Sequence, residues 1–222
     1  MTTPGRVLVA GSGAVGSVVG GLLANAGVPV TLLGRVAHIE AIAGHGLRVS
    51  GLYGDHHVRT LEGATSADAL AGRFDTVLLT VKSWDTRTMT TLVAPFLAPD
   101  GTLVCLQNGL GNLEIAAEVV GPDRVLGGRV IFGAEVTAPG RVHVSVHADP
   151  TLLGPVDPTH PRLAATAATL ADVFQRAGVP AEPTTTILAD LWGKVLYNAA
   201  LNPLGALLGV PYGRLAENPH TK

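Results

Sequence analysis

The fold of this chain is decided by its opening segment, Arg6-Val7-Leu8-Val9-Ala10-Gly11-Ser12-Gly13-Ala14-Val15-Gly16. Residues 7–10 form a short apolar run, which is typical of a central strand in a parallel sheet. Three glycines follow at the spacing Gly-x-Gly-x-x-Gly, and a helix is predicted from about Ala14 to Ala26. This order of strand, tight turn and helix predicts the first crossover of a doubly wound α/β fold.

Each glycine of the turn has a separate physical role in the binding of a dinucleotide. Gly11 permits the tight turn, Gly13 lets the backbone approach a pyrophosphate, and Gly16 lets the helix pack close to the strand. The helix N-terminus adds free N–H groups and a partial positive charge of roughly +0.5. The alternative is a glycine-rich turn without a ligand. We predict cofactor binding by the whole loop, which comprises Gly11, Ser12, Gly13, Ala14, Val15 and Gly16.

The end of the second predicted strand selects between the two nicotinamide cofactors. A fold that is specific for NAD usually has Asp or Glu there, which binds the ribose 2′-hydroxyl. This chain has Thr31-Leu32-Leu33-Gly34-Arg35 instead, without an acidic residue. A guanidinium can pair with a 2′-phosphate through two parallel hydrogen bonds, so we predict NADP(H) as the cofactor. The alternative for Arg35 is a solvated charge that opens the next helix.

Strand-like and helix-like segments alternate along most of the chain, which predicts a Rossmann-type, doubly wound parallel sheet. The strand-like residues 124–153 turn at Ala138-Pro139-Gly140 and predict an added antiparallel hairpin. A long helix is predicted from Ile187 to about Leu208, with an interruption at Pro203. We therefore divide the chain into an NADP-binding domain at residues 1–185 and the first part of a helical substrate or dimerisation domain at residues 186–222. Further strands are predicted at 28–33, 46–50, 57–62, 75–81, 102–106 and 179–182, and further helices at 36–43, 86–96, 110–120 and 163–177.

The composition excludes several classes of protein. With 222 residues, 47% hydrophobic residues and a net charge of −2, the chain is not a disordered, nucleic-acid-binding or lipid-binding protein. The uncharged run from Val7 to Leu33 contains six glycines and is not a membrane span. Cys105 lies in an apolar run and predicts a buried thiol in a cytoplasmic protein. His143 and His147 lack the further ligands that a metal site needs.

Polar residues follow two more strands of the predicted sheet. Ligands of an open α/β sheet lie beyond the carboxyl ends of its strands. Lys82, in Thr80-Val81-Lys82-Ser83-Trp84, is a candidate to add charge near the adenosine phosphate. Asn108, in Gln107-Asn108-Gly109, is a candidate to reach the nicotinamide end. The alternatives are a surface lysine and a turn residue.

The late segment carries a polar stripe on an apolar helix. Lys194, Asn198 and Asn202 are spaced by four residues and share one helix face. Because the residues between them are mostly apolar, we expect this stripe to cross a buried surface, where a ligand supplies its partners. Lysine, unlike arginine, can release a proton when burial lowers its pKa. The alternative is a structural lysine with two bridging amides.

Taken with their order and spacing, these motifs resemble those of the ketopantoate reductase (2-dehydropantoate 2-reductase) family. The matching features are the glycine loop, Arg35, Val81-Lys82-Ser83-Trp84, Gln107-Asn108-Gly109, the Pro139-Gly140 turn, and Leu191-Trp192-Gly193-Lys194 through Asn202-Pro203. The resemblance implies transfer of hydride from NADPH to the ketone of 2-dehydropantoate, which gives pantoate for pantothenate and coenzyme A synthesis.

The resemblance also implies a role for each candidate residue. Lys194 matches the general acid of the family, and Asn108 matches the amide near the nicotinamide and the reacting oxygen. Asn198 and Asn202 match amides that bind the 2-oxo acid. Arg35 and Lys82 match the residues that hold the NADP phosphate.

The family's helical domain continues beyond the position of Lys222, and includes a serine and a glutamate that cannot be assigned here. We therefore expect a C-terminally truncated chain that is not fully active. Its tail from about Leu188 would expose apolar residues, so we expect it to be disordered, exchanged between chains, or covered in a homodimer or larger oligomer. These apolar residues are Val195, Leu196, Leu201, Leu204, Leu207, Leu208 and Val210.

Three alternatives to this function stay open. The chain could be a dinucleotide-binding module or fragment without turnover, or a related reductase that acts on another 2-oxo acid. An NAD-linked hydroxyacid or opine dehydrogenase is the third alternative. Loss of turnover with retained NADPH affinity in Lys194→Ala would favour the enzyme, and a comparison of NADPH with NADH would test the third.

Overall fold

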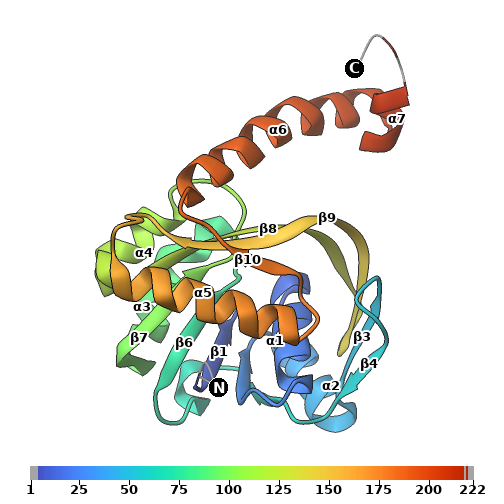
Figure 1. Ribbon diagram of the computed structural model, residues 1–222. Helices are drawn as coiled ribbons and strands as arrows, with labels where there is room; N and C mark the ends of the chain where they lie inside the picture. Colours follow the sequence, from blue (N-terminus) through green and yellow to red (C-terminus); the bar gives the residue numbers. More distant parts are fainter. Residues whose placement is uncertain (1–4, 218, 220–222) are drawn as a thin grey trace.

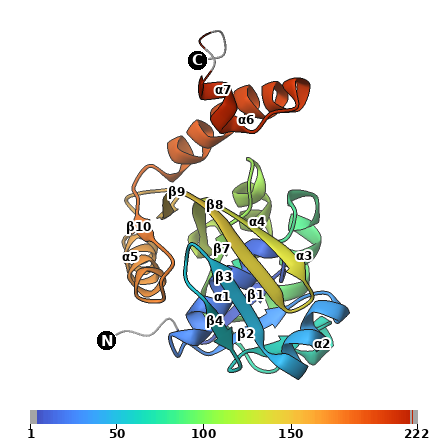
Figure 2. The ribbon, with the colours of Figure 1, turned by 90° about the vertical axis from the view of Figure 1, so that its right-hand side faces the viewer.

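The computed structural model describes residues 5–217 and 219 as one mixed sheet with helices on both faces (Figures 1 and 2). The parallel core has the strand order β5-β2-β1-β6-β7-β8, which is the order of a doubly wound dinucleotide-binding sheet. Its reversal point lies between β1 and β6, where ligands of such sheets bind. The predicted fold class is therefore confirmed. These core strands are β1 (Val7–Ala10), β2 (Val30–Leu33), β5 (Glu62–Ala64), β6 (Phe74–Leu79), β7 (Leu97–Cys105) and β8 (Val125–Ala138).

The predicted hairpin is present and extends the sheet beyond β8. Strand β9 (Arg141–Pro155) pairs antiparallel with β8, and the turn between them falls at Pro139 and Gly140. Strand β3 (Leu47–Gly51) pairs parallel with β9, and β4 (His56–Val58) closes this edge antiparallel to β3. Strand β10 (Ala181–Pro183) pairs parallel with the other end of β9.

Helices bury the sheet on both faces. Helices α1 (Ala14–Asn25) and α5 (Pro161–Arg176) share one apolar core with the central strands and β9. Helices α3 (Thr86–Val93) and α4 (Asn112–Val120) close the core on the opposite face. Cys105 is buried in this second core, and burial followed by the charge of Glu114 raises its pKa to about 12. The remaining helix of this part, α2 (Val36–His45), packs near the β3–β4 edge.

Helix α6 (Ile187–Leu208) corrects two expectations. It runs through Pro203 without interruption, because a proline costs one hydrogen bond and not the whole helix. It also rises away from the sheet and ends beside α7 (Tyr212–Glu217), so the polar stripe does not cross a buried surface (Figure 1). Beyond its first turn the helix is largely exposed, for example by 83% at Leu207.

The apolar exposure predicted for this tail is confirmed, at Leu196, Leu204, Leu207 and Leu208. Within the described residues of this tail, α6 and α7 are helical in place of the predicted disorder, while residues 218 and 220–222 lie outside the described part of the chain. Its exchange between chains or its covering in an oligomer stays a prediction.

The strand predicted at 57–62 is wrong: the structure has the end of β4 and the start of β5 there, and these two strands lie at opposite edges of the sheet. Other differences concern the ends of elements. The predicted turn at residues 99–101 lies inside β7, where the pairing with β6 shifts its register. The last strand begins at Ala181 and not at Val179. A short 3₁₀ turn at Ala94–Phe96 replaces the end of the helix predicted at 86–96. Further 3₁₀ turns lie outside the predicted helices, at Ala67–Ala69, Ser83–Asp85 and Pro122–Arg124.

Among the helices that the structure describes, none combines the length and the apolar character that a membrane span requires. Within residues 5–217 and 219, no group of three or more His, Cys, Asp or Glu side chains is placed to hold a metal ion. His143 and His147 instead contact Ser50 and Tyr53, respectively.

Candidate active site

A cleft of about 720 Å³ lies at the reversal point of the sheet, beyond the carboxyl ends of β1, β2 and β6. We call it the glycine-loop cleft. Gly11, Ser12 and Gly13 line this cleft together with Arg35 and Lys82. The structure thus brings together three features that are far apart in the sequence and were predicted separately.

The glycine loop is fixed to both neighbouring strands. The N–H groups of Gly11 and Ser12 donate to the carbonyl of Leu33 in β2, at 3.0 and 3.1 Å. The hydroxyl of Thr80, after β6, donates to the carbonyl of Gly11 at 2.6 Å. A Cβ at Gly16 would lie 2.1 Å from that same carbonyl, so the helix can approach the loop only with glycine there.

The unpaired backbone N–H groups at the N-terminus of α1 are suited to bind an anion. Because Leu33 already accepts from Gly11 and Ser12, the free donors are the N–H groups of residues 13–16. No described residue accepts from these four groups, which leaves them for a ligand or solvent. The predicted loop therefore divides into two residues that anchor it and four that present donors.

Gly13 differs from the other loop glycines, because neither its conformation nor its packing requires glycine. Its φ of −74° and ψ of −166° are extended values that any residue adopts. A Cβ built there meets no atom within 4 Å. The missing side chain therefore leaves space for something outside the protein, as the close approach of a diphosphate requires.

We predict that Gly13→Ala separates folding from binding. The free energy of unfolding should change by less than about 1 kcal/mol, because reduced unfolded-state freedom offsets a poorer helix cap. The added methyl group should weaken NADPH binding by about tenfold or more, equal to about 1.4 kcal/mol. Denaturant unfolding and calorimetry measure the two effects. Equal affinity in both proteins would contradict a diphosphate against Gly13.

The two candidate cations are free to bind a phosphate. Arg35 and Lys82 are exposed, and both line the cleft. Within residues 5–217 and 219, neither side chain forms an ion pair or a hydrogen bond. Arg35 is also the residue that precedes the first turn of α2, so its charge faces solvent at a helix N-terminus.

Asn108 follows β7 and is held by its backbone. Its carbonyl accepts from the hydroxyl of Ser83 at 2.8 Å and from the side-chain amide of Asn112 at 3.1 Å. Asn112 is itself fixed by the hydroxyl of Thr86, at 2.7 Å. Two loops that follow neighbouring strands are thereby joined, and the side chain of Asn108 is left free for other partners.

Lys194 meets Asn108 across 86 residues of sequence. Its ammonium donates to Oδ1 of Asn108 at 2.5 Å, and also donates to the carbonyl of Val130 in β8. Burial, followed by the charge of Arg129, lowers the pKa of Lys194 from 10.5 to about 8. A lysine with this pKa is well placed to exchange a proton near neutral pH.

The other two amides of α6 are not brought to this point. Asn198 is half-buried and Asn202 is exposed, one and two turns beyond Lys194 on the same helix face. Neither forms a hydrogen bond to another described residue. The structure therefore joins Lys194 and Asn108, and brings neither Asn198 nor Asn202 to them.

A buried histidine links the hairpin turn to the glycine loop. The N–H of Gly140 donates to Nδ1 of His38 at 3.1 Å, so Nε2 carries the proton and lies 3.0 Å from the hydroxyl of Ser17. That hydroxyl donates to the carbonyl of Ser12. Burial, and then the charge of Arg35, lowers the pKa of His38 and keeps this imidazole neutral.

Several of these residues were missed by the sequence analysis. Thr80 and Ser83 lie in the segment that gave Lys82, and their position after a buried strand was the available signal. His38 and Asn112 gave no signal, because polar residues inside predicted helices are common. The carbonyl of Val130 is a backbone group, which no residue type encodes.

Comparison with known proteins decides the family. The sequence profile described as "Ketopantoate reductase PanE/ApbA" matches residues 7–158, and its C-terminal counterpart matches residues 186–222. The chain belongs to the ketopantoate reductase family. Two curated family members, both named 2-dehydropantoate 2-reductase, come from Aquifex aeolicus and Archaeoglobus fulgidus. They are 36% and 37% identical to this chain over 217 and 216 residues, which cover 98% and 97% of it.

Solved structures of the ketopantoate reductase family agree in fold. The 2-dehydropantoate 2-reductase of Geobacter metallireducens matches with a TM-score of 0.87 and 31% identity, over 97% of this chain and 70% of that one. A PanE/ApbA family ketopantoate reductase of Ralstonia eutropha matches with a TM-score of 0.82 and 33% identity, over 97% of this chain and 68% of that one. The chain thus spans about two thirds of its family members' length, since it covers 67% and 68% of the two curated relatives.

Proposed function

We propose that this chain binds NADP(H) and reduces 2-dehydropantoate to pantoate, with Lys194 as the proton donor. The observation that carries the proposal is the contact of Lys194 with Asn108, beside a cleft that presents free N–H groups and two cations. The names of the relatives support the same substrate. The free guanidinium of Arg35, in place of an acidic residue, supports NADP(H) over NAD(H).

The cofactor fits the residues of the cleft. The N–H groups of residues 13–16 would bind the diphosphate, and Arg35 and Lys82 would bind the 2′-phosphate. The space over Gly13 lets the diphosphate reach the backbone. When bound, NADPH supplies the hydride for the reduction.

The protein's own residues supply the proton and the orientation. Reduction of a ketone adds a hydride to the carbonyl carbon and a proton to its oxygen. The protonated amine of Lys194 gives this proton and becomes neutral, which its lowered pKa allows. Oδ1 of Asn108 accepts a hydrogen bond from Lys194. The Nδ2 group of Asn108 is therefore left to donate to the ketone oxygen of the substrate. We assign Asn198 and Asn202, farther along the same face, to binding of the 2-oxo acid.

The rate of reduction should depend on the charge of Lys194. We predict that kcat/KM for reduction falls by about tenfold per pH unit above pH 8, because the neutral amine has no proton to give. A pH profile of the steady-state rate measures this, with circular dichroism to show that the protein stays folded. A rate that stays level well above this pH would exclude Lys194 as the donor.

The decisive test is oxidation of NADPH with 2-dehydropantoate, measured on this chain with other 2-oxo acids in parallel. Turnover with 2-dehydropantoate supports the proposal. Turnover only with another 2-oxo acid would keep the reductase and change the substrate. Binding of NADPH without turnover on any of them would favour a non-catalytic dinucleotide-binding module. Preference for NADH would support an NAD-linked dehydrogenase.

A further inference from the structure

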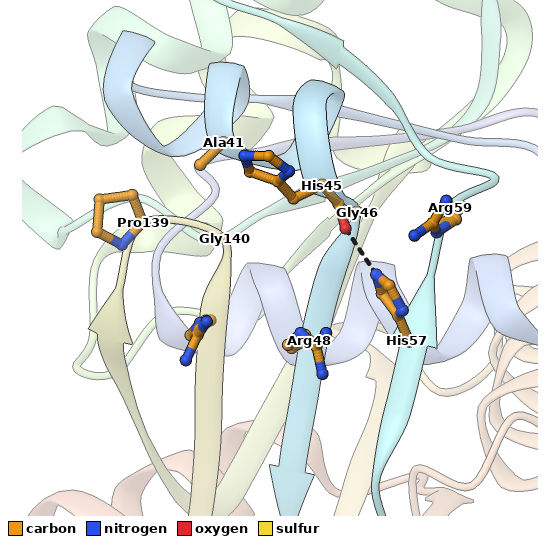
Figure 3. Close-up of a pocket in the computed structure, with 9 residues that line it drawn as sticks. Ala41, His45, Gly46, Arg48, His57, Arg59, Pro139 and Gly140 are labelled. Carbon is orange, nitrogen blue, oxygen red and sulfur yellow. Dashed lines mark hydrogen bonds between the residues drawn. The ribbon is translucent and has the colours of Figure 1, made fainter.

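A second cavity, of about 410 Å³, lies at the β3–β4 edge of the sheet, where α2 ends (Figure 3). We call it the arginine pocket. Figure 3 shows His57 reaching the end of α2, with Arg48 and Arg59 on either side of it and Pro139 and Gly140 at the neighbouring hairpin turn. This cavity shares no lining residue with the glycine-loop cleft.

The charge of the pocket has one sign. Its side chains include three arginines and two histidines, and no carboxylate lines it. Within the described part of the chain, none of the three arginines forms an ion pair or a side-chain hydrogen bond. Other arginines of this protein, such as Arg87 and Arg176, do pair with carboxylates. The arginines of the pocket are Arg48, Arg59 and Arg141, and its histidines are His45 and His57.

Strand pairing places these residues side by side. Arg48 in β3 is in register with Arg141 in β9 on one side and with His57 in β4 on the other. Neighbouring strands lie about 4.8 Å apart, so the three residues form a row across the sheet. Like charges directly opposite each other destabilise a sheet. The row therefore carries a cost that no described side chain offsets, and that a bound anion would remove.

Local structure keeps the row on the outer face. Leu47 and Val49 flank Arg48 and are buried in the core, so the alternation of β3 directs Arg48 away from it. Val58, between His57 and Arg59, is buried in the same way. Nε2 of His57 donates to the carbonyl of His45 at 2.6 Å, which fixes its ring at the end of α2.

We propose that the arginine pocket binds a small molecule with two or more phosphoryl groups. A concave cavity of this volume suits a small ligand and not a macromolecule. Guanidinium groups on adjacent strands match the several oxygen atoms of linked phosphates through paired hydrogen bonds. The proposed site is separate from the glycine-loop cleft of the proposed reductase function, since the two share no lining residue.

The test is calorimetry of the full chain with inorganic pyrophosphate, at constant ionic strength. The double variant Arg48→Ala/Arg141→Ala should weaken pyrophosphate binding in the arginine pocket by tenfold or more. Its affinity for NADPH should be unchanged. Pyrophosphate is also expected to bind at the glycine loop. The double variant Arg35→Ala/Lys82→Ala should weaken only that second binding, and should keep pyrophosphate binding in the arginine pocket. Arg176→Ala is the matched control and should bind like the unmodified chain.

Three results would overturn the proposal. One is equal pyrophosphate binding by Arg48→Ala/Arg141→Ala, and another is a response that chloride reproduces at the same ionic strength. The third is orthophosphate binding as tightly as pyrophosphate, since several guanidiniums should favour linked phosphates. If the alanine variant does not fold, Arg48→Gln/Arg141→Gln answers the same question. Titration with a nucleoside diphosphate then shows whether the site also accepts a nucleoside.

Discussion

Replacement of Lys194 by alanine is expected to lower kcat for 2-dehydropantoate reduction by about 10²–10⁴-fold, the usual contribution of a positioned general acid. The dissociation constant for NADPH should stay within about twofold, because Lys194 contacts Asn108 and Val130 and does not line the glycine-loop cleft. Steady-state kinetics and calorimetry measure the two quantities on the same preparation.

The control for this experiment is Leu207→Ala, farther along α6. Leu207 is exposed and contacts neither site, so this variant should keep the rate of the unmodified chain. A Lys194→Ala protein with nearly full kcat would show that another group donates the proton. A large loss of NADPH affinity would instead assign Lys194 to cofactor binding.

Replacement of Arg35 by alanine is expected to remove the preference for NADPH over NADH. Hydrogen bonds to charged groups contribute about 1.5–3 kcal/mol, so NADPH should bind about 10- to 100-fold more weakly. Binding of NADH should not change, because that cofactor lacks the 2′-phosphate. The ratio of the two dissociation constants, measured by calorimetry, is the readout.

Arg87→Ala is the matched control for Arg35→Ala. Arg87 is another exposed arginine, but it pairs with Glu118 on the surface of α3 and α4 and does not line the cleft. Its removal should leave both dissociation constants unchanged. Equal weakening of NADPH and NADH by Arg35→Ala would mean that the guanidinium binds a part that the two cofactors share.

The sequence was sufficient for the fold class and for the glycine loop, because both depend on local patterns. The apolar run at residues 7–10 and the following glycines specify a strand, a turn and a helix in one continuous segment. Lys82 and Asn108 were also found as candidates, because ligands of such a sheet lie beyond the carboxyl ends of its strands and only the position of each strand is needed to apply this. The structure shows Lys82 in the cleft and Asn108 beside Lys194.

Other features depend on which distant segments pair, and these could not be predicted. The row through Arg48 exists only because β3 pairs with β9, more than ninety positions later along the chain. The apolar pattern of α6 predicted burial, but periodicity does not tell whether a covering partner belongs to the same chain. The division into domains at residue 185 stays a prediction.

The chain of hydrogen bonds through His38 restricts how this protein can be engineered. The tip of a β-hairpin is ordinarily a tolerant place for an inserted tag or a fused partner. Here the amide of Gly140 holds the imidazole that positions Ser17 against the carbonyl of Ser12. One extra residue in that tip would withdraw this donor and disturb the glycine loop. Fusions are better attached to the exposed end of α5, near Gly178, where the backbone turns at the surface.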